Sequence, residues 1–195
     1  MNKHVNIAQE LRRPAARMPS APRKYTAADI FFFLKAGLIK EGAKFELLDG
    51  EIIPMSPKGV NHEATRLTIA RWLQRPWARK FDSLQELTLP TAGDTVLEPD
   101  FAVFKRGTNL RERPLTGADI YLVIEVADSS LDHDLKTKSQ KYAAFGISEY
   151  WVVDVNSGET HVHRGPIKKG WSETHKVSAG RPLAPLCAPT AALKL

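Results

Sequence analysis

A seven-residue apolar run from Ile120 to Val126 constrains the fold of this chain more than any other segment. Its only charged member is Glu125, and both faces of the extended run are otherwise apolar or aromatic. Such a run is typical of a central strand that is covered on both sides. Apolar residues recur at helical spacing in residues 61–73 and 131–145, which predicts helices able to cover those two faces. The sequence therefore predicts a mixed α/β (α+β) domain around one sheet.

Capping and turn signals predict the other elements. Thr26 is suited to cap a helix that continues to about Leu38. Asp49-Gly50 is a strong hairpin signal between two apolar runs, so residues 44–55 are predicted to form a hairpin. Further strands are predicted at 83–89, 95–104 and 150–155, with a hairpin returning over 160–164. The last part of the chain is rich in Pro and Gly and is left unassigned.

Charge and composition limit the class of protein. The chain has 195 residues and a net charge of +6, and much of the excess lies in residues 1–23, which are predicted to be a basic, poorly ordered arm. Residues 24–195 are predicted to form a single domain. No apolar run approaches the ~18–20 residues of a membrane span, and none resembles a signal peptide. The single cysteine, Cys187, excludes an internal disulfide. We expect a cytoplasmic protein without membrane contact and with a polyanionic partner.

Two carboxylates stand at conspicuous positions in the predicted strands. Glu125 interrupts the central apolar run, where a carboxylate is costly unless it is paired, hydrogen-bonded or bound to a metal. Asp100 follows Pro99, which cannot donate to a strand ladder and so marks a bulge or an edge. Each also has an ordinary interpretation, Glu125 as a cap for the following loop and Asp100 as a turn residue. Neither carboxylate is specific by itself.

A lysine on the predicted helix at 131–145 strengthens the functional interpretation of the two carboxylates. On a wheel of about 100° per residue, Lys138 falls in the middle of an apolar stripe. The stripe consists of Leu131, Leu135, Tyr142 and Phe145. An inward lysine either covers apolar surface or meets a carboxylate or an anion. Two carboxylates that hold Mg²⁺, with a lysine that supplies positive charge, are suited to metal-dependent phosphodiester hydrolysis.

At these residues the chain resembles the Uma-type family of restriction endonucleases, within the PD-(D/E)XK nuclease superfamily. The resemblance covers about residues 25–165. Its most specific parts are the hairpin Glu46-Leu47-Leu48-Asp49-Gly50-Glu51 and the run ending in Glu149-Tyr150-Trp151. It also includes Met55-Ser56-Pro57, His62, Glu98-Pro99-Asp100, Ile124-Glu125-Val126, Asp134, Lys138 and Tyr142.

The resemblance implies a restriction-endonuclease-like core with flanking helices and an N-terminal β-hairpin. It implies that Asp100 and Glu125 are catalytic carboxylates and ligands of Mg²⁺, or of Mn²⁺ in its place. Ala127 occupies the position of the usual lysine, two residues after Glu125. The catalytic lysine corresponds instead to Lys138, on the following helix. The activity implied is that of a metal-dependent endodeoxyribonuclease acting on DNA as a homodimer or a higher homo-oligomer.

The resemblance also gives two supporting candidates. Glu46 and His62 match family positions near the metal. The ordinary alternatives are an exposed hairpin residue for Glu46 and a helix cap for His62. Asp128 stands where the family usually has a proline, which alters the loop after the central strand.

Three alternative interpretations are open from the sequence. The first is a catalytically silent module that binds nucleic acid or protein on the same fold. The second is a serine hydrolase, because Ser129 and Ser130 lie close to His133 in the sequence, but the chain lacks a Gly-x-Ser-x-Gly elbow. The third is a metal site on His161 and His163, for which no third ligand is evident, so that exposed hairpin residues are expected there.

Overall fold

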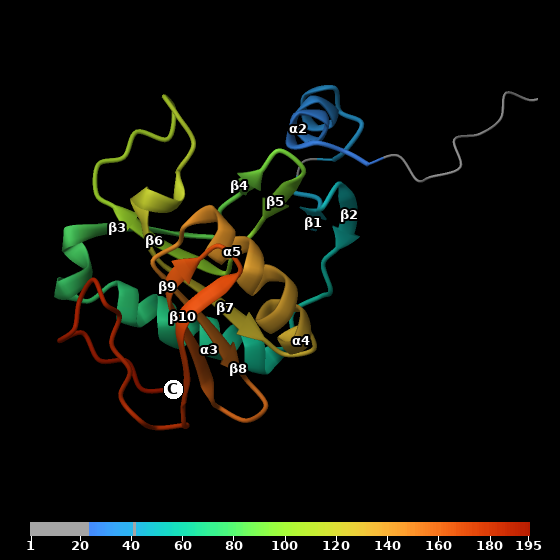
Figure 1. Cartoon of the computed structure of the whole chain (residues 1–195). Helices are drawn as coiled ribbons and strands as arrows, with labels where there is room; N and C mark the ends of the chain where they lie inside the picture. Colours follow the sequence, from blue (N-terminus) through green and yellow to red (C-terminus); the bar gives the residue numbers. More distant parts are fainter. Residues whose placement is uncertain (1–23, 41) are drawn as a thin grey trace, which may run out of the picture.

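The computed structural model describes residues 24–40 and 42–195 (Figure 1). The predicted basic arm at residues 1–23 lies outside these residues. The helices are α2 (Ala27–Lys35), α3 (Val60–Leu73), α4 (Leu131–His133) and α5 (Ser139–Phe145), with a π-helical segment η3 (Asp134–Lys138) and short 3-10 helices η1 (Pro76–Lys80) and η2 (Gly117–Asp119). None of the helices in these ranges is both long and apolar enough to cross a membrane.

The strands form two sheets, whereas the sequence predicted one. The large sheet has six strands in the order β10-β9-β8-β7-β6-β3, and the small sheet has four in the order β2-β1-β5-β4. Their bounds are β1 (Phe45–Leu48), β2 (Glu51–Pro54), β3 (Phe81–Gln85), β4 (Leu89–Ala92), β5 (Thr95–Leu97), β6 (Phe101–Lys105), β7 (Ile120–Ala127), β8 (Glu149–Asp154), β9 (Thr160–Ile167) and β10 (Gly170–Val177). Neighbouring strands are antiparallel except β7 and β8, which are parallel. The mixed α/β class is therefore as predicted.

The second sheet arises because two predicted strands each divide in two. The predicted strand 95–104 divides into β5 in the small sheet and β6 in the large sheet, with Glu98-Pro99-Asp100 between them. Pro99 has no N–H to donate, so a ladder cannot continue through it on the donor side. The predicted strand 83–89 divides between β3 and β4, and Glu86 lies in this break with a φ of 51°. Both breaks therefore lie where the chain passes from one sheet to the other.

Helices cover both faces of the large sheet, as the apolar run in β7 requires (Figure 1). On one face, α3 contributes Ile69, Trp72 and Leu73 to a core that includes Leu122, Ile124 and Val126 of β7. On the other face, Val123 and Ala127 of β7 pack in a core with Tyr142, Leu131 and Phe145 from the helix at 131–145. Because side chains alternate along a strand, Glu125 shares the face of Val123 and Ala127. It is thus directed toward the helix that carries Lys138.

Local sequence signals account for the ends of several elements. Thr26 caps α2, and its side chain accepts a hydrogen bond from the backbone of residue 29. The helix ends at Lys35, three residues before the predicted end at Leu38. The predicted hairpin is present, with Asp49 at a φ of 50° and Gly50 at a φ of 82°. Two central residues with positive φ are what a type I′ hairpin turn requires.

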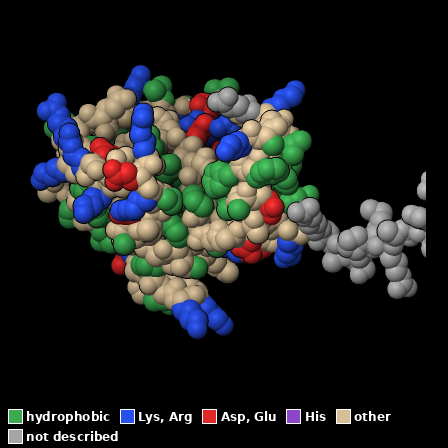
Figure 2. Space-filling view, turned by 90° about the horizontal axis from the view of Figure 1, so that it is seen from above, with side chains coloured by type: hydrophobic (Ala, Val, Ile, Leu, Met, Phe, Trp, Pro, Cys, Tyr) green, Lys and Arg blue, Asp and Glu red, His purple; other side chains and the backbone are tan. Residues whose placement is uncertain are grey.

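The outer side of α2 is apolar. Ile30 packs with Leu47 and Val96 of the small sheet, whereas Phe31 and Phe32 are 45% and 62% exposed. Figure 2 looks down on this part of the molecule, where green side chains gather beside the start of the grey segment. The helix therefore covers the small sheet with one side and leaves an apolar side in contact with solvent.

The C-terminal part, which the sequence left unassigned, adds β10 and a tail over the core. Leu183, Ala191 and Leu193 of the tail join the core on the α3 side of the large sheet. The indole nitrogen of Trp72 donates to the backbone oxygen of Ala191 at 3.1 Å. The backbone N–H of Leu186 donates to the carboxylate of Glu149. The tail is therefore anchored by both apolar packing and hydrogen bonds.

Candidate active site

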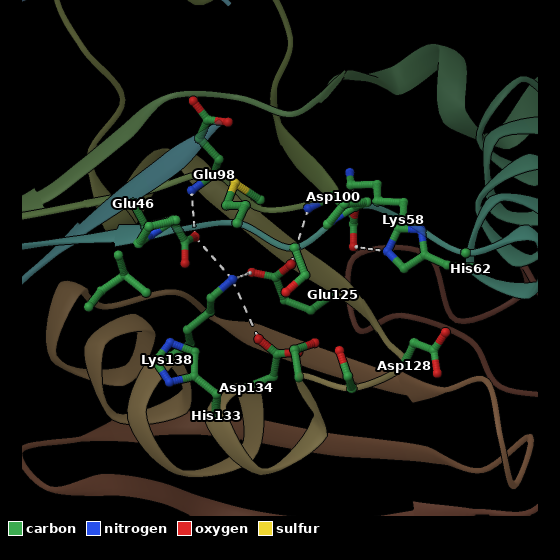
Figure 3. A pocket seen from close by; sticks show the side chains of 18 residues that line it. Glu46, Lys58, His62, Glu98, Asp100, Glu125, Asp128, His133, Asp134 and Lys138 are labelled. Carbon is green, nitrogen blue, oxygen red and sulfur yellow. Dashed lines mark hydrogen bonds and ion pairs between the residues drawn. The ribbon is translucent and has the colours of Figure 1, made fainter. Parts of the chain in front are cut away.

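A pocket of about 240 Å³ lies between the β1–β2 hairpin, the start of α3 and the helix that begins with α4 (Figure 3). The five residues predicted from the sequence all line it: Glu46, His62, Asp100, Glu125 and Lys138. They come from β1, α3, the residue before β6, β7 and η3, and the fold brings them together from distant parts of the chain. Each of the five is buried.

Asp100 and Glu125 lie side by side because β6 and β7 are neighbours. Phe101 pairs with Ile124 in the ladder. The backbone N–H of Asp100 donates to Glu125 Oε2 at 3.3 Å, and the backbone N–H of Val126 donates to Asp100 Oδ2 at 2.9 Å. Each carboxylate is thus held by the backbone of the other strand. These two hydrogen bonds fix the positions of both side chains.

Lys138 lies at the centre of a group of three carboxylates (Figure 3). Its Nζ is 3.0 Å from Glu46 Oε1, 3.1 Å from Glu125 Oε1 and 3.4 Å from Asp134 Oδ1. Burial alone would lower the pKa of Lys138, but these negative charges outweigh burial and raise that pKa. Lys138 is therefore a permanent cation, and its inward orientation is as predicted from the helical wheel.

A π-helical segment places Lys138 and Asp134 together. The segment η3 spans Asp134–Lys138 between two α-helical pieces, and both of its end residues are buried. One-turn π segments in longer helices occur often at functional sites. Asp134 is further held by the hydroxyl of Ser130, which donates to Oδ2 at 2.6 Å. The helical wheel placed Asp134 only at the flank of the apolar stripe, because a regular α-helical period does not describe this turn.

The ordinary alternatives for the two supporting residues are wrong. Glu46 is buried, and its Oε1 accepts a hydrogen bond from the backbone N–H of Glu98 at 2.9 Å. His62 is not a helix cap, because Gly59 occupies the N-cap of α3. Its Nε2 lies 3.4 Å from Asp100 Oδ2. Both side chains therefore contact members of the predicted set.

Further residues of the site were missing from the sequence prediction. The hydroxyl of Tyr142 donates to Glu125 Oε1 at 2.8 Å. Lys58 Nζ donates to Asp100 Oδ1 at 2.9 Å, and Arg66 Nε lies 3.3 Å from the same oxygen. Tyr142 and Arg66 each follow a predicted residue by four positions on the same helix, a spacing that could have found them. Lys58 lies in a loop, and no local pattern marks it.

Burial and crowding of negative charge act on Glu125. Burial raises the pKa of Glu125 to about 8, against the lowering effect of Lys138. The neighbouring carboxylates raise it further, Asp134 most and then Asp100 and Glu46. The buried lysine therefore does not neutralise the carboxylates that surround it. A further cation beside Glu125 would stabilise its ionised form.

Asp100 has the opposite electrostatic character. Burial would raise its pKa, but the contact with His62, the charge of Lys58 and the hydrogen bond from Val126 together lower that pKa to about 2. Asp100 is therefore ionised at neutral pH. A pocket with one fixed carboxylate beside a second one that favours an added cation is chemically suited to a metal ion.

The donor set fits an ion that keeps much of its water. Within residues 24–40 and 42–195, no three His, Cys, Asp or Glu side chains converge as a complete metal cage. Mg²⁺ does not need one, since it is usually bound by one or two carboxylates together with waters and substrate phosphates. Asp100 and Glu125 supply such a carboxylate pair at the wall of the pocket. Asp100 and Glu125 are therefore the residues of this pocket that could hold such an ion.

His163, one of the two histidines considered as an alternative metal site, packs against aromatic rings. His163 on β9 is half-buried rather than exposed, with its ring centroid 5.6 Å from that of Tyr150 and 5.8 Å from that of Trp171. Burial lowers the pKa of His163 to about 4. It is therefore a packed, neutral side chain.

Comparisons with known proteins identify a family and a similar fold. The sequence matches the model of the Uma2 family, described as "Putative restriction endonuclease", over residues 31–194. A search of the curated proteins gave no match. Among solved structures, the chain is similar to a "putative nuclease belonging to DUF820" from Anabaena variabilis ATCC 29413, with 20% identity, a TM-score of 0.65 and coverage of 89% of this chain and 95% of that chain. This similarity shows a shared fold, and the family match over most of the sequence shows that the chain belongs to the Uma2 family of restriction-endonuclease-like proteins.

Proposed function

We propose that this protein is a divalent-metal-dependent endonuclease that hydrolyses phosphodiester bonds in DNA. The observation that carries the proposal is the grouping of the buried side chains of Asp100, Glu125 and Lys138 around one pocket. Membership of a restriction-endonuclease-like family supports the nuclease class. Mg²⁺ is the metal we propose, with Mn²⁺ as the alternative, because both prefer carboxylate and water oxygens.

Each pocket residue has a separate role in this proposal. Asp100 and Glu125 would hold the ion, which supplies an activated water and neutralises charge on the phosphodiester. His62 and the backbone of Val126 orient Asp100, and such contacts to a metal ligand tune its position and basicity. Lys138 places a fixed positive charge beside Glu125, where negative charge would develop on the phosphate. Glu46 and Asp134 hold Lys138 in that place.

A catalytically silent binding module on the same fold is the second candidate. One observation favours it: the ammonium group of Lys138 faces three carboxylates, so all three of its protons have partners. A lysine in that state holds the site together without acting on a substrate. The two candidates differ in whether metal produces cleavage.

Cleavage of supercoiled plasmid distinguishes these candidates. The wild-type protein is assayed with Mg²⁺, with Mn²⁺ and with EDTA, next to Asp100→Asn, Glu125→Gln and Lys138→Met. Lys136→Met is the matched control, because Lys136 is exposed on the same helix and contacts only Asp132 among the ion pairs of the described residues. The nuclease proposal expects metal-dependent nicking that the three pocket variants lose and the control keeps. Nucleic-acid binding without cleavage by any of the proteins would refute catalysis and leave the binding module.

We also propose that residues 24–195 act as one domain and that the protein forms a homodimer, which would allow both strands of a duplex to be cut. The exposed apolar side of α2 offers a contact surface for a second copy. Light scattering after size-exclusion chromatography tests this, with Phe32→Glu expected to give a monomer. A cytoplasmic location stays a prediction from the composition.

A further inference from the structure

Three cationic side chains converge on one carboxylate beside the candidate active site. Glu86 Oε2 lies 2.8 Å from Lys44 Nζ. Glu86 Oε1 lies 2.7 Å from Lys58 Nζ and 3.4 Å from Arg66 Nη2. The cations come from the residue before β1, the loop before α3 and α3 itself. Within this group the Glu86 carboxylate has the surroundings of an anion in a binding site.

The backbone at Glu86 is held in an uncommon conformation. Its φ of 51° is in the left-handed region, which few residues other than glycine and asparagine adopt. Glu86 follows β3, the edge strand of the large sheet, at the point where the chain crosses to the small sheet. Such a conformation persists where the surroundings hold the residue, and it is concentrated at functional sites. The backbone N–H of Glu86 donates to the backbone oxygen of Asp100 at 3.4 Å. Lys44 and Lys58 hold the Glu86 side chain, and their hydrogen bonds lower its pKa to about 2.

The cation group continues into the catalytic pocket through Asp100. Lys58 contacts Glu86 and Asp100 at once, with 2.9 Å between its Nζ and Asp100 Oδ1. Arg66 does the same, with 3.3 Å between its Nε and that oxygen. Lys58 also lines the pocket next to Asp100 (Figure 3). An anion in the place of the Glu86 carboxylate would therefore lie next to the proposed metal ligands.

The geometry points to a binding site for a backbone phosphate of the nucleic acid, formed by Lys44, Lys58 and Arg66 and occupied by Glu86 until the substrate displaces it. A phosphodiester carries one negative charge and two free oxygens, as a carboxylate does, so it can accept the same hydrogen bonds. The exchange leaves none of the cations unpaired, which matters for Arg66 because it is only 12% exposed. This inference rests on the proposed function. It adds a contact that would hold the nucleic-acid backbone next to the scissile phosphate.

If Glu86 and phosphate compete for the same cations, two variants should change the affinity for nucleic acid in opposite directions. Glu86→Gln removes the internal anion and is expected to tighten nucleic-acid binding about threefold to fivefold, the weight of one exposed ion pair. Lys44→Met removes a phosphate contact without touching Asp100. It is expected to weaken binding by a similar factor and to reduce the salt slope of log K by about 0.9, the value for one lost phosphate contact. When Lys44→Met is already present, Glu86→Gln is expected to raise the affinity for nucleic acid by a smaller factor than it does in the wild type.

The test measures binding by fluorescence anisotropy in EDTA, with a labelled DNA duplex and with an RNA duplex of the same sequence. The matched controls are Glu159→Gln and Lys176→Met, an exposed pair on the β9–β10 hairpin with 3.1 Å between Nζ and Oε2. Glu159 is 35% exposed and Glu86 is 32% exposed, so the two carboxylates differ mainly in their surroundings. Thermal melting of each variant confirms that it is folded. The nucleic acid that shows the opposite effects of Glu86→Gln and Lys44→Met is the source of the phosphate.

The outcomes separate this inference from the proposed function. If the wild type binds but Glu86→Gln changes affinity no more than Glu159→Gln, or if its gain is undiminished in the Lys44→Met background, the phosphate site is refuted and the nuclease proposal stands. If the predicted changes occur and no metal produces cleavage, the phosphate site stands and the catalytic proposal falls. If the wild type binds neither DNA nor RNA in EDTA, the phosphate site is refuted, and plasmid cleavage with metal decides the nuclease proposal by itself.

Discussion

Replacing Lys138 by methionine tests the electrostatics of the pocket most directly. The side chain keeps its length, but Glu46, Glu125 and Asp134 lose the ammonium group that lies within 3.4 Å of each. Breaking a buried ion pair by removing one partner costs about 3–5 kcal/mol. Glu125 can take up a proton, because its pKa is raised to about 8, so we expect the lower end of that range. At ~2–4 °C per kcal/mol for a chain of this size, the midpoint of thermal unfolding should fall by about 6–12 °C.

The assay is thermal unfolding at neutral pH in EDTA and in Mg²⁺, for the wild type, Lys138→Met and the exposed control Lys136→Met. An added divalent cation is expected to restore part of the loss in Lys138→Met, because it neutralises the same carboxylates and binds only the folded state. In the double variant Lys138→Met with Glu125→Gln, the losses should not add, since one change removes the charge that the other leaves unpaired. Equal midpoints for Lys138→Met and Lys136→Met would refute this account of the pocket.

Three further predictions concern parts of the fold outside the pocket. Burial lowers the pKa of His163 to about 4, below its ~6.5 in an unfolded chain, so its contribution to stability is present above pH 6.5 and is lost as the pH falls toward 4. Because the ring is only half-buried, about 1–2 kcal/mol of acid-side loss should disappear in His163→Gln, measured by urea unfolding across that window. Glu149→Gln replaces the carboxylate that accepts the hydrogen bond from the N–H of Leu186, and it should lower the free energy of unfolding by about 2–4 kcal/mol. Limited proteolysis should then cleave the C-terminal tail faster than in the wild type. Gly117→Ala should cost about 1–3 kcal/mol, because its Cβ would collide with a backbone oxygen of α5, whereas Gly93→Ala, with nothing within 4 Å, should be close to neutral.

Periodicity and turn chemistry predicted the elements that depend on local sequence. The hairpin at Asp49-Gly50, the capped start at Thr26 and the helix ending at Gly146 are all present, the last with a φ of 90° at its glycine. The inward orientation of Lys138 also followed from one helix alone. These features could be predicted because the residues that decide them lie within a few positions of one another.

The composition of the site could be predicted only in part. Asp100 and Glu125 were found because a carboxylate in or beside an apolar strand is unusual, and their assignment as ligands came from the family resemblance. Lys58 was missed because its partners, Glu86 and Asp100, lie 28 and 42 positions further along the chain. A lysine in a polar loop has no local pattern that distinguishes a pocket residue from a solvated one.

The sequence by itself determined most of the helical and extended segments up to residue 164, the two apolar faces of the central strand, and the inward orientation of Lys138. Only the tertiary structure decided that the strands split into two sheets at Pro99 and Glu86, that β7 and β8 run parallel, and that Glu46 from the small sheet meets Lys138 from the helix on the large one. The physical reason is that strand pairing depends on contacts between segments far apart in the chain. Their closure entropy is offset by the packing of the whole core, which no local pattern records.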